Sequence, residues 1–417
     1  MVGFKFCKTR QNFLILFLSL IFISCSAQES SNQTSEVKES FKWRMVTTWP
    51  KNYPGVGLGA ENLAKLVEEM SDGRLQIKVY GNGELVPALE VFDTVSRGSV
   101  EMGHGAAYYW IGKVPAAQFF TAIPFGLNAQ EMNAWLHYGG GQELWEELYE
   151  PFNLIPMAGG NTGVQMAGWF NKEINSLEDL KGIRMRIPGM AGKVFTRAGG
   201  EAVLMPGSEI FTNLQTGVID AAEWIGPYND LTFGFHQAAK YYYYPGWHEP
   251  GPTLETIINK EAFDSLPKNL QVILKTASRA INQDMLDEYT SRNNQALISL
   301  VNDHNVELRK LPDDVLAEFK RITKELYPQN LETKYFLKKL KTNKVKTIGN
   351  LKFIENDNEK FNTISNKLKS QFKTKKIWVA SSTHSNEELF CAKTHIQLKK
   401  KIKNLIMNFE AKYLESY

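Results

Sequence analysis

The sequence predicts an α/β fold for most of this chain of 417 residues. Segments with strand character and segments with helix character alternate between residues 41 and 328, as is typical of α/β proteins. Hydrophobic residues make up 43% of the chain, which is enough for two lobes with cores of their own. No cysteine lies between Cys25 and Cys391, so we expect these lobes to hold together without disulfides or thiolate metal sites.

The early part of the chain follows a regular strand and helix order. Strands are expected where strand-forming residues cluster, and helices where apolar residues recur at helical spacing. The Ser71-Asp72-Gly73 sequence is a stop signal for the first helix. The expected elements are a strand over 41–49, a turn over 54–59, a helix over 60–70, a strand over 75–80, a helix over 85–96 and a short strand over 100–107.

The later part of the chain has mainly helical character. Residues 261–316 form one long stretch of helical pattern, and proline interrupts it near Pro267 and Pro312. We find no internal repeat, and apart from the N-terminus no segment approaches the length of a membrane span. These features favour a globular protein with one unusually long helical region.

The N-terminus predicts export. Basic residues precede an apolar run over 13–23, which is too short for a stable membrane span, and small residues follow it. We therefore expect a signal peptide over 1–27 and a polar, flexible tether over 28–40. Cys25 leaves two outcomes open, which are cleavage and lipidation at this cysteine, or cleavage after Ala27 with the cysteine discarded. The protein is thus expected in the periplasm, with lipid anchoring undecided.

Composition changes sharply near Pro328. Residues 329–417 contain 19 lysines, no arginine and 8 acidic residues, and the rest of the chain has 29 basic and 37 acidic residues. Proline is absent after Pro328, and together these shifts indicate two pieces of different origin. A solvated lysine-rich tail is the simpler interpretation, but it does not account for the apolar segments over 376–380 and 402–409.

Residues 161–249 contain the polar groups that indicate a binding site. Arg186 offers a planar fork of donors that fits a carboxylate. Gln165, Glu223 and Glu249 offer the oxygen atoms that a hard cation prefers. No nucleophile and base accompany them, so we expect a small organic acid to be held beside a metal ion without conversion. Taken by itself, each glutamate is better explained as an ordinary surface or capping carboxylate.

Several motifs in residues 41–327 carry a family resemblance. They are TTWP, GNGELVPALEVFDTVSRGSVEMGHG, GNTGVQMAGWF, SLEDLKGIRMRIPG and LQTGVIDAAEWIGPYND. In their order and spacing they resemble the solute-binding subunit of tripartite ATP-independent periplasmic (TRAP) transporters of the DctP type. The form EWIGPYND resembles members that bind 2-oxo or 2-hydroxy monocarboxylates. The resemblance implies a periplasmic-binding-protein architecture of two α/β lobes, joined by hinge strands and a long helix, that closes on its ligand.

The resemblance also implies roles for individual residues. Arg186 matches the arginine that grips the ligand carboxylate. Gln165, Glu223 and Glu249 match the side chains that hold a cation, and the Trp224 carbonyl is the expected fourth protein oxygen. Two facing carboxylates repel each other unless a cation or proton lies between them, which favours Na⁺ or Ca²⁺. A match at Glu249 is weaker, because its local sequence is a variant.

Other residues near these motifs are weaker candidates. Asn161 could donate to the ligand, and Tyr109, beside Tyr108, could form an aromatic wall, although aromatic residues are more often part of a core. On a regular strand Arg184 shares a face with Arg186, so side-chain direction cannot separate them. The family match falls on Arg186, and we expect Arg184 to be structural or solvated. His104 has no partner at metal-ligand spacing and is expected to be a buried structural residue.

The C-terminal segment carries a second resemblance. GNLKF at 349–353 and ASSTHSNEE at 380–388 resemble the interior of a 3-deoxy-octulosonate (Kdo) transferase of lipid A assembly. We expect residues 329–417 to be an inactive α/β remnant fused to the intact solute-binding domain over 41–328. The alternative function, a Kdo-type glycosyltransferase, would need the missing parts of that enzyme. We expect the binding function, with TRAP permease subunits as partners, a homodimer left open and no nucleic-acid partner.

Overall fold

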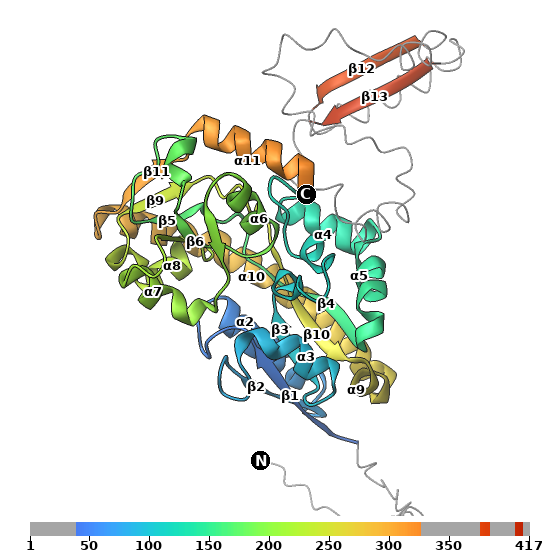
Figure 1. Cartoon of the computed structure of the whole chain (residues 1–417). Coiled ribbons are helices and arrows are strands. Elements are labelled where there is room, and N and C mark those ends of the chain that lie inside the picture. The colour runs from blue at the N-terminus through green and yellow to red at the C-terminus, as the bar shows by residue number, and fades with distance from the viewer. Residues whose placement is uncertain (1–38, 327–375, 384–404, 412–417) are drawn as a thin grey trace, which may run out of the picture. The chain divides into compact units, whose positions relative to one another are not determined.

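The computed structural model describes residues 39–326, 376–383 and 405–411 (Figure 1). It divides the chain into two compact units, over 1–340 and 341–417, which are described separately. The expected signal peptide, nearly all of the tether and most of the lysine-rich segment lie outside the described residues. Within the described part, no helix has the length and apolar character needed to cross a bilayer.

The first lobe is built on a five-stranded sheet with the order β2-β1-β3-β10-β4. Strand β1 pairs in parallel with β2 and β3, while β10 is antiparallel to both β3 and β4. Strand β10 comes from much later in the sequence, so the chain returns to the first lobe after it has built most of the second. The strands are β1 (Phe41–Thr47), β2 (Leu75–Tyr80), β3 (Met102–Gly105), β4 (Leu154–Asn161) and β10 (Thr253–Asn259).

Hydrophobic clusters cover both faces of this sheet. Side chains alternate along β1, so Trp43 and Met45 join one cluster and Val46 joins the other. The surrounding helices and 3₁₀ turns are α2 (Val56–Met70), η1 (Ala88–Glu90), α3 (Val91–Ser96), η2 (Ala107–Trp110), η3 (Ala117–Phe120), α4 (Ala129–Tyr138), α5 (Gly141–Tyr149), η4 (Glu150–Phe152) and α9 (Lys260–Ser265).

The second lobe is built on a six-stranded sheet with the order β11-β9-β5-β8-β6-β7. Strand β6 is parallel to β7 and β8, β5 is antiparallel to β8 and β9, and β11 is parallel to β9. The strands are β5 (Gly168–Phe170), β6 (Arg184–Arg186), β7 (Glu201–Val203), β8 (Ala221–Ala222), β9 (Tyr241–Tyr244) and β11 (Glu307–Lys310). The helices and turns are η5 (Leu177–Leu180), α6 (Gly189–Arg197), α7 (Gly207–Gln215), α8 (Pro227–Phe233), η6 (Phe235–Gln237) and α11 (Asp313–Leu326).

One long helix connects the lobes. Helix α10 (Lys268–Asn302) has 35 residues and packs on β4 and α2 of the first lobe and on α8 of the second (Figure 1). A shared hydrophobic cluster includes Trp49 of the first lobe, Trp224 of the second and Tyr289 of α10. The Tyr53 hydroxyl also donates to the Asn229 carbonyl oxygen at 2.8 Å. The two lobes are therefore in direct contact in this structure.

The predicted α/β fold with a long helix is confirmed, but several element boundaries differ from the expectation. Helix α2 begins at Val56, within the stretch expected to be a turn. Its glycines serve close packing, since a Cβ added at Gly57 would lie 2.6 Å from the Pro50 carbonyl oxygen. The break near Pro267 is confirmed. The sequence did not reveal β11, because that strand depends on pairing with β9, which is distant in the sequence.

The second compact unit contains two described strands. Strands β12 (Lys376–Thr383) and β13 (Leu405–Ala411) pair in parallel. They coincide largely with the two apolar segments that a purely solvated tail does not explain. The expectation of a partial α/β piece is compatible with this pairing, but its resemblance to a Kdo transferase stays a prediction.

Candidate functional site

The candidate site lies where the chain crosses between the two sheets. Gln165 is on the segment between β4 and β5, and Glu249 is on the segment between β9 and β10. The Gln165 backbone N–H donates to the Glu249 carbonyl oxygen at 3.1 Å, so the two segments run together. Gly246 allows this approach, because a Cβ there would lie 1.9 Å from the Gln165 carbonyl oxygen. Two connecting segments that are distant in the sequence thus bring Gln165 and Glu249 together.

Arg186 ends strand β6 and is completely buried in the site. The Glu223 N–H donates to the Arg186 carbonyl oxygen at 3.1 Å, and the Glu223 carboxylate forms an ion pair with the Arg186 guanidinium. Arg186 Nε donates to the Met205 carbonyl oxygen and Nη2 to the Tyr109 hydroxyl, both at 3.3 Å. Its guanidinium carbon lies 5.2 Å from the centre of the Trp224 ring. Protein groups on several sides therefore hold the guanidinium in place.

The turn that follows strand β6 helps to set the direction of the Arg186 side chain. Pro188 and Gly189 follow Ile187, the next residue after Arg186, and Gly189 adopts a φ of +65°, a backbone conformation that disfavours other residues. Burial acts to lower the pKa of Arg186, but the nearby Glu223 and the two tyrosines at 108 and 109 more than offset this effect, so its pKa is raised. The arginine stays charged in a site without solvent contact.

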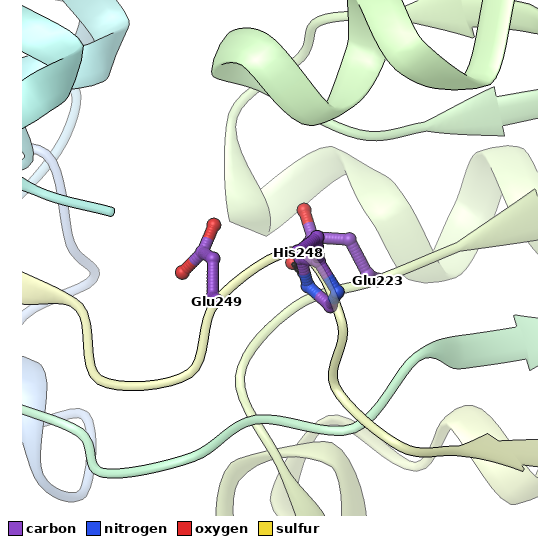
Figure 2. Close-up of side chains that lie close together, drawn as sticks. All are labelled: Glu223, His248 and Glu249. Carbon is purple, nitrogen blue, oxygen red and sulfur yellow. Dashed lines mark hydrogen bonds and ion pairs between the residues drawn. The ribbon is translucent and has the colours of Figure 1, made fainter. Parts of the chain in front are cut away.

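Glu223, His248 and Glu249 form a buried cluster (Figure 2). One potential ligand atom from each residue lies within 4.8 Å of the others. His248 Nε2 is 3.3 Å from Glu223 Oε2, on the carboxylate whose other oxygen pairs with Arg186. Sequence reasoning did not select His248 as a site residue. Its position directly before Glu249, in the local variant His-Glu-Pro, was the available signal.

Several buried polar atoms in this cluster have no hydrogen-bond partner within the described structure. They are Gln165 Oε1, Glu249 Oε2 and His248 Nδ1. A buried acceptor without a donor costs free energy, so such atoms indicate a missing ligand, ion or water. Burial, and then the charge of Glu223, raise the pKa of Glu249 well above its usual value, although Arg186 opposes them. A cation between the carboxylates would satisfy these oxygens, and the donor set fits a hard cation.

The structure gives Tyr109 and Asn161 different surroundings. The Tyr109 hydroxyl accepts a hydrogen bond from Arg186, and its role at a ligand stays a prediction. The Asn161 amide donates to the Gly251 carbonyl and the Thr253 hydroxyl at 3.3 Å, and its oxygen accepts from Gly163 N–H at 2.8 Å. These contacts tie together the two crossing segments and leave the Asn161 amide engaged within the protein.

The two residues expected to be structural have structural partners. Arg184 Nε donates to Asp220 Oδ2 at 2.9 Å, and its side chain is 42% exposed, whereas that of Arg186 is 0% exposed. His104 is fully buried and its pKa is lowered to about 4 by burial. Its Nδ1 accepts from Trp49 Nε1 at 2.8 Å and its Nε2 lies 3.0 Å from the Gly159 carbonyl oxygen. Both expectations are confirmed.

A family comparison identifies the type of protein. The model of the DctP family, described as bacterial extracellular solute-binding protein, family 7, matches residues 45–334. The chain belongs to this family. A monocarboxylate 2-oxoacid-binding periplasmic protein of Nostoc sp. is 45% identical over 308 residues, which cover 74% of this chain and 84% of the relative. The resemblance seen in the motifs is thus confirmed for the DctP-like part of the chain.

Solved structures of TRAP periplasmic solute-binding proteins have the same fold. A protein of Pseudoalteromonas atlantica, with bound sodium and pyruvate, has a TM-score of 0.70 at 44% identity, covering 73% of this chain and 94% of that one. A protein of Colwellia psychrerythraea, with bound calcium and pyruvate, has a TM-score of 0.70 at 43% identity, with the same coverage. A protein of Bordetella bronchiseptica, a dimer with calcium and picolinate, has a TM-score of 0.71 at 33% identity, covering 87% of this chain and 100% of that one.

Proposed function

We propose that this solute-binding protein captures a small 2-oxo or 2-hydroxy monocarboxylate such as pyruvate. The observation that carries the proposal is the fully buried Arg186 guanidinium, near Gln165 Oε1 and Glu249 Oε2, which have no hydrogen-bond partner among the described residues. A bidentate contact between Arg186 and a ligand carboxylate would contribute roughly 1.5–3 kcal/mol. The sodium and calcium complexes of similar proteins with pyruvate support this ligand class.

A hard cation completes the proposed site. Gln165, Glu223, Glu249 and the Trp224 carbonyl supply its oxygens, and the ligand carboxylate and 2-oxo group supply more. Na⁺ and Ca²⁺ both suit such an oxygen shell. Arg186 pairs with Glu223 in the structure, so we expect ligand and cation to exchange partners, with the ligand carboxylate taking the guanidinium and the cation taking Glu223.

The aromatic residues have different proposed roles. Tyr109 lines the ligand position and holds Arg186. The Trp224 ring packs against Arg186 and is proposed to line the ligand position. Its backbone carbonyl oxygen is proposed to bind the cation. We propose no direct ligand contact for Asn161, because its amide group forms hydrogen bonds within the two crossing segments.

The protein delivers its ligand to a TRAP membrane permease and catalyses no reaction in this proposal. The expected signal peptide would direct it to the periplasm. Mass spectrometry can test lipidation of Cys25, and the molar mass in solution can test a homodimer. The dimer of the similar Bordetella protein is the reason to measure whether this protein forms a homodimer. The lysine-rich segment over 329–417 is taken as an inactive remnant, and the Kdo transferase alternative gains nothing from the comparisons.

Calorimetry tests the proposal. Pyruvate should bind the wild-type protein in Ca²⁺ or Na⁺, and chelation or replacement of the cation should weaken binding. Arg186→Lys should weaken binding by at least about tenfold, since an ammonium cannot reproduce the guanidinium fork. Arg184→Lys on the same strand is the matched control and should bind like wild type. Wild-type affinity in Arg186→Lys would reject the site, and binding indifferent to every cation would reject the metal.

A further inference from the structure

A polar cavity lies in the second lobe, and none of the residues of the proposed binding site lines it. Its volume is about 420 Å³. It is formed where η6 and the residues that lead from it into β9 face the turn that follows the long helix α10. Two histidines from these separate segments, His236 and His304, line it together with the amides of Asn171, Gln237 and Asn305. Neither histidine takes part in the proposed capture of an organic acid.

The two imidazole rings face one another closely. Their centres are 4.1 Å apart with an angle of 41° between the planes. Bonds from imidazole nitrogen to a metal are about 2.0–2.1 Å long, so two rings at this separation can share one ion once a nitrogen of each, on the half-buried His236 and the exposed His304, turns toward it. His236 Nδ1 is buried and has no hydrogen-bond partner within the described structure. A nitrogen of this kind costs free energy unless a ligand satisfies it.

The charge around the pair permits a cation. Burial, and then the proximity of His304, lower the pKa of His236. A neutral ring has the lone pair that a metal needs. Lys240 also lines the cavity, but its ammonium pairs with Glu307 Oε1 at 2.5 Å and is largely exposed. The ammonium charge is thus compensated locally and screened by solvent.

We propose that His236 and His304 form a binding site for a transition-metal ion such as Zn²⁺ or Cu²⁺. Imidazole nitrogen suits these ions, whereas Na⁺ and Ca²⁺ prefer the oxygens of the first site. Water or the neighbouring amides complete the coordination. Because His304 follows α10 and His236 belongs to η6, a bound ion links the end of the long helix to the second lobe.

Zinc titration of the full chain, without a histidine tag, tests the site. Pyruvate and Ca²⁺ are kept saturating, so that the cluster at Glu223 is occupied, and His248→Gln reports any zinc that still binds there. His236→Ala and His304→Ala should each raise the zinc dissociation constant at least about tenfold. His137→Ala, on α4 outside the cavity, should leave it unchanged.

Two further readouts separate the outcomes. Cu²⁺ bound to the wild type should give nitrogen superhyperfine structure in its electron paramagnetic resonance spectrum, and both cavity variants should reduce it. Thermal unfolding checks that the variants fold, and His236→Asn replaces the alanine variant if it does not. Zinc binding that survives both substitutions, or no zinc binding in the wild type, overturns the site. Pyruvate affinity should be unchanged in both variants, so failure here is distinct from failure of the proposed function.

Discussion

Two kinds of buried carboxylate can be compared in this protein. Asp230 in the second lobe and Glu255 in the first each accept hydrogen bonds from a tryptophan and a tyrosine, and the other oxygen of Asp230 accepts from the Ile225 backbone N–H. Trp169 Nε1 and the Tyr242 hydroxyl donate to Asp230 Oδ2 at 2.9 and 2.6 Å. Glu255 accepts one hydrogen bond on each oxygen. Both groups are scaffold, because their acceptor capacity is met by the protein itself.

The carboxylates of the proposed site are different. Glu223 shares its two oxygens between Arg186 and His248, and Glu249 Oε2 has no partner within the described structure. All four carboxylates are buried, so burial alone does not distinguish scaffold from site. What distinguishes the site carboxylates is a buried oxygen without a hydrogen-bond partner, next to a second carboxylate. The following predictions test this difference, from the largest expected effect to the smallest.

Breaking the buried ion pair should have the largest effect. Arg186→Met leaves Glu223 buried without its cation, and such a loss costs about 3–5 kcal/mol of unfolding free energy. Urea unfolding without ligand measures it. Arg184→Met is the control, and its loss should be much smaller because that pair is partly exposed. Adding Glu223→Gln to Arg186→Met should recover part of the stability. Equal losses in the two arginine variants would contradict the comparison.

Glu249 should couple cation binding to proton release. Its pKa is raised in the free protein by burial and by Glu223, with Arg186 opposing, and Tyr108 and His248 are also nearby. Cation binding needs the carboxylate, so it should expel the proton, and Ca²⁺ affinity should rise with pH above the usual carboxyl range. Calorimetry in buffers of different ionisation enthalpy measures the proton.

The variant Glu249→Gln sharpens this test. It should abolish the proton release and weaken Ca²⁺ binding by at least about tenfold. Glu255→Gln, at a carboxylate whose oxygens are both engaged, should leave Ca²⁺ affinity unchanged. If both variants lose Ca²⁺ affinity equally, the distinction between scaffold and site carboxylates is wrong.

The scaffold carboxylates should instead make stability depend on pH. Burial raises the pKa of both Asp230 and Glu255 to about 7. A raised pKa means that the folded state holds its proton more tightly than the unfolded state, so this stabilisation is complete below the usual values and is lost as pH rises through about 7. Each group should lower the unfolding free energy by up to ~1.4 kcal/mol per pH unit in this window. Asp230→Asn should flatten the dependence measured by urea unfolding from pH 4.5 to 8.

His248 should have a smaller effect. His248→Gln removes the ring that contacts Glu223 but keeps a donor of similar reach, so pyruvate affinity should fall by about 0.5–1.5 kcal/mol. Calorimetry measures this loss at one pH, with Arg184→Lys as the unaffected reference. A complete loss of binding would instead make His248 a principal ligand of the cation.

Removal of the lysine-rich segment should have the smallest effect. A chain that ends at Pro328 keeps all the site residues, so its pyruvate affinity should equal that of the full chain. Stability can fall, because the family match extends to residue 334. A chain ending at Leu340 is the matched control. Folded protein that has lost pyruvate binding after truncation at Pro328 would contradict the assignment of the remnant.

Much of the fold was predictable from local pattern. Strand β1 alternates, the break at Pro267 is present, and the long helical region contains α10. Strand β11 was missed, and so was the early start of α2, because both depend on contacts with segments elsewhere in the chain. The order and spacing of the motifs indicated the family, whereas the periodicity of apolar residues indicated only helices and strands. Motifs are more specific because they contain the side chains that the function requires.

The sequence by itself determined the residue types of the site, namely a guanidinium, an amide and carboxylates near glycine turns. Only the tertiary structure decided which of them meet and what remains unmet. Arg184 and Arg186 share a strand, yet only Arg186 is enclosed by other segments. His248 became a site residue because a separate strand brings Glu223 beside it. Burial and hydrogen-bond partners are properties of the folded chain, because segments distant in the sequence supply them.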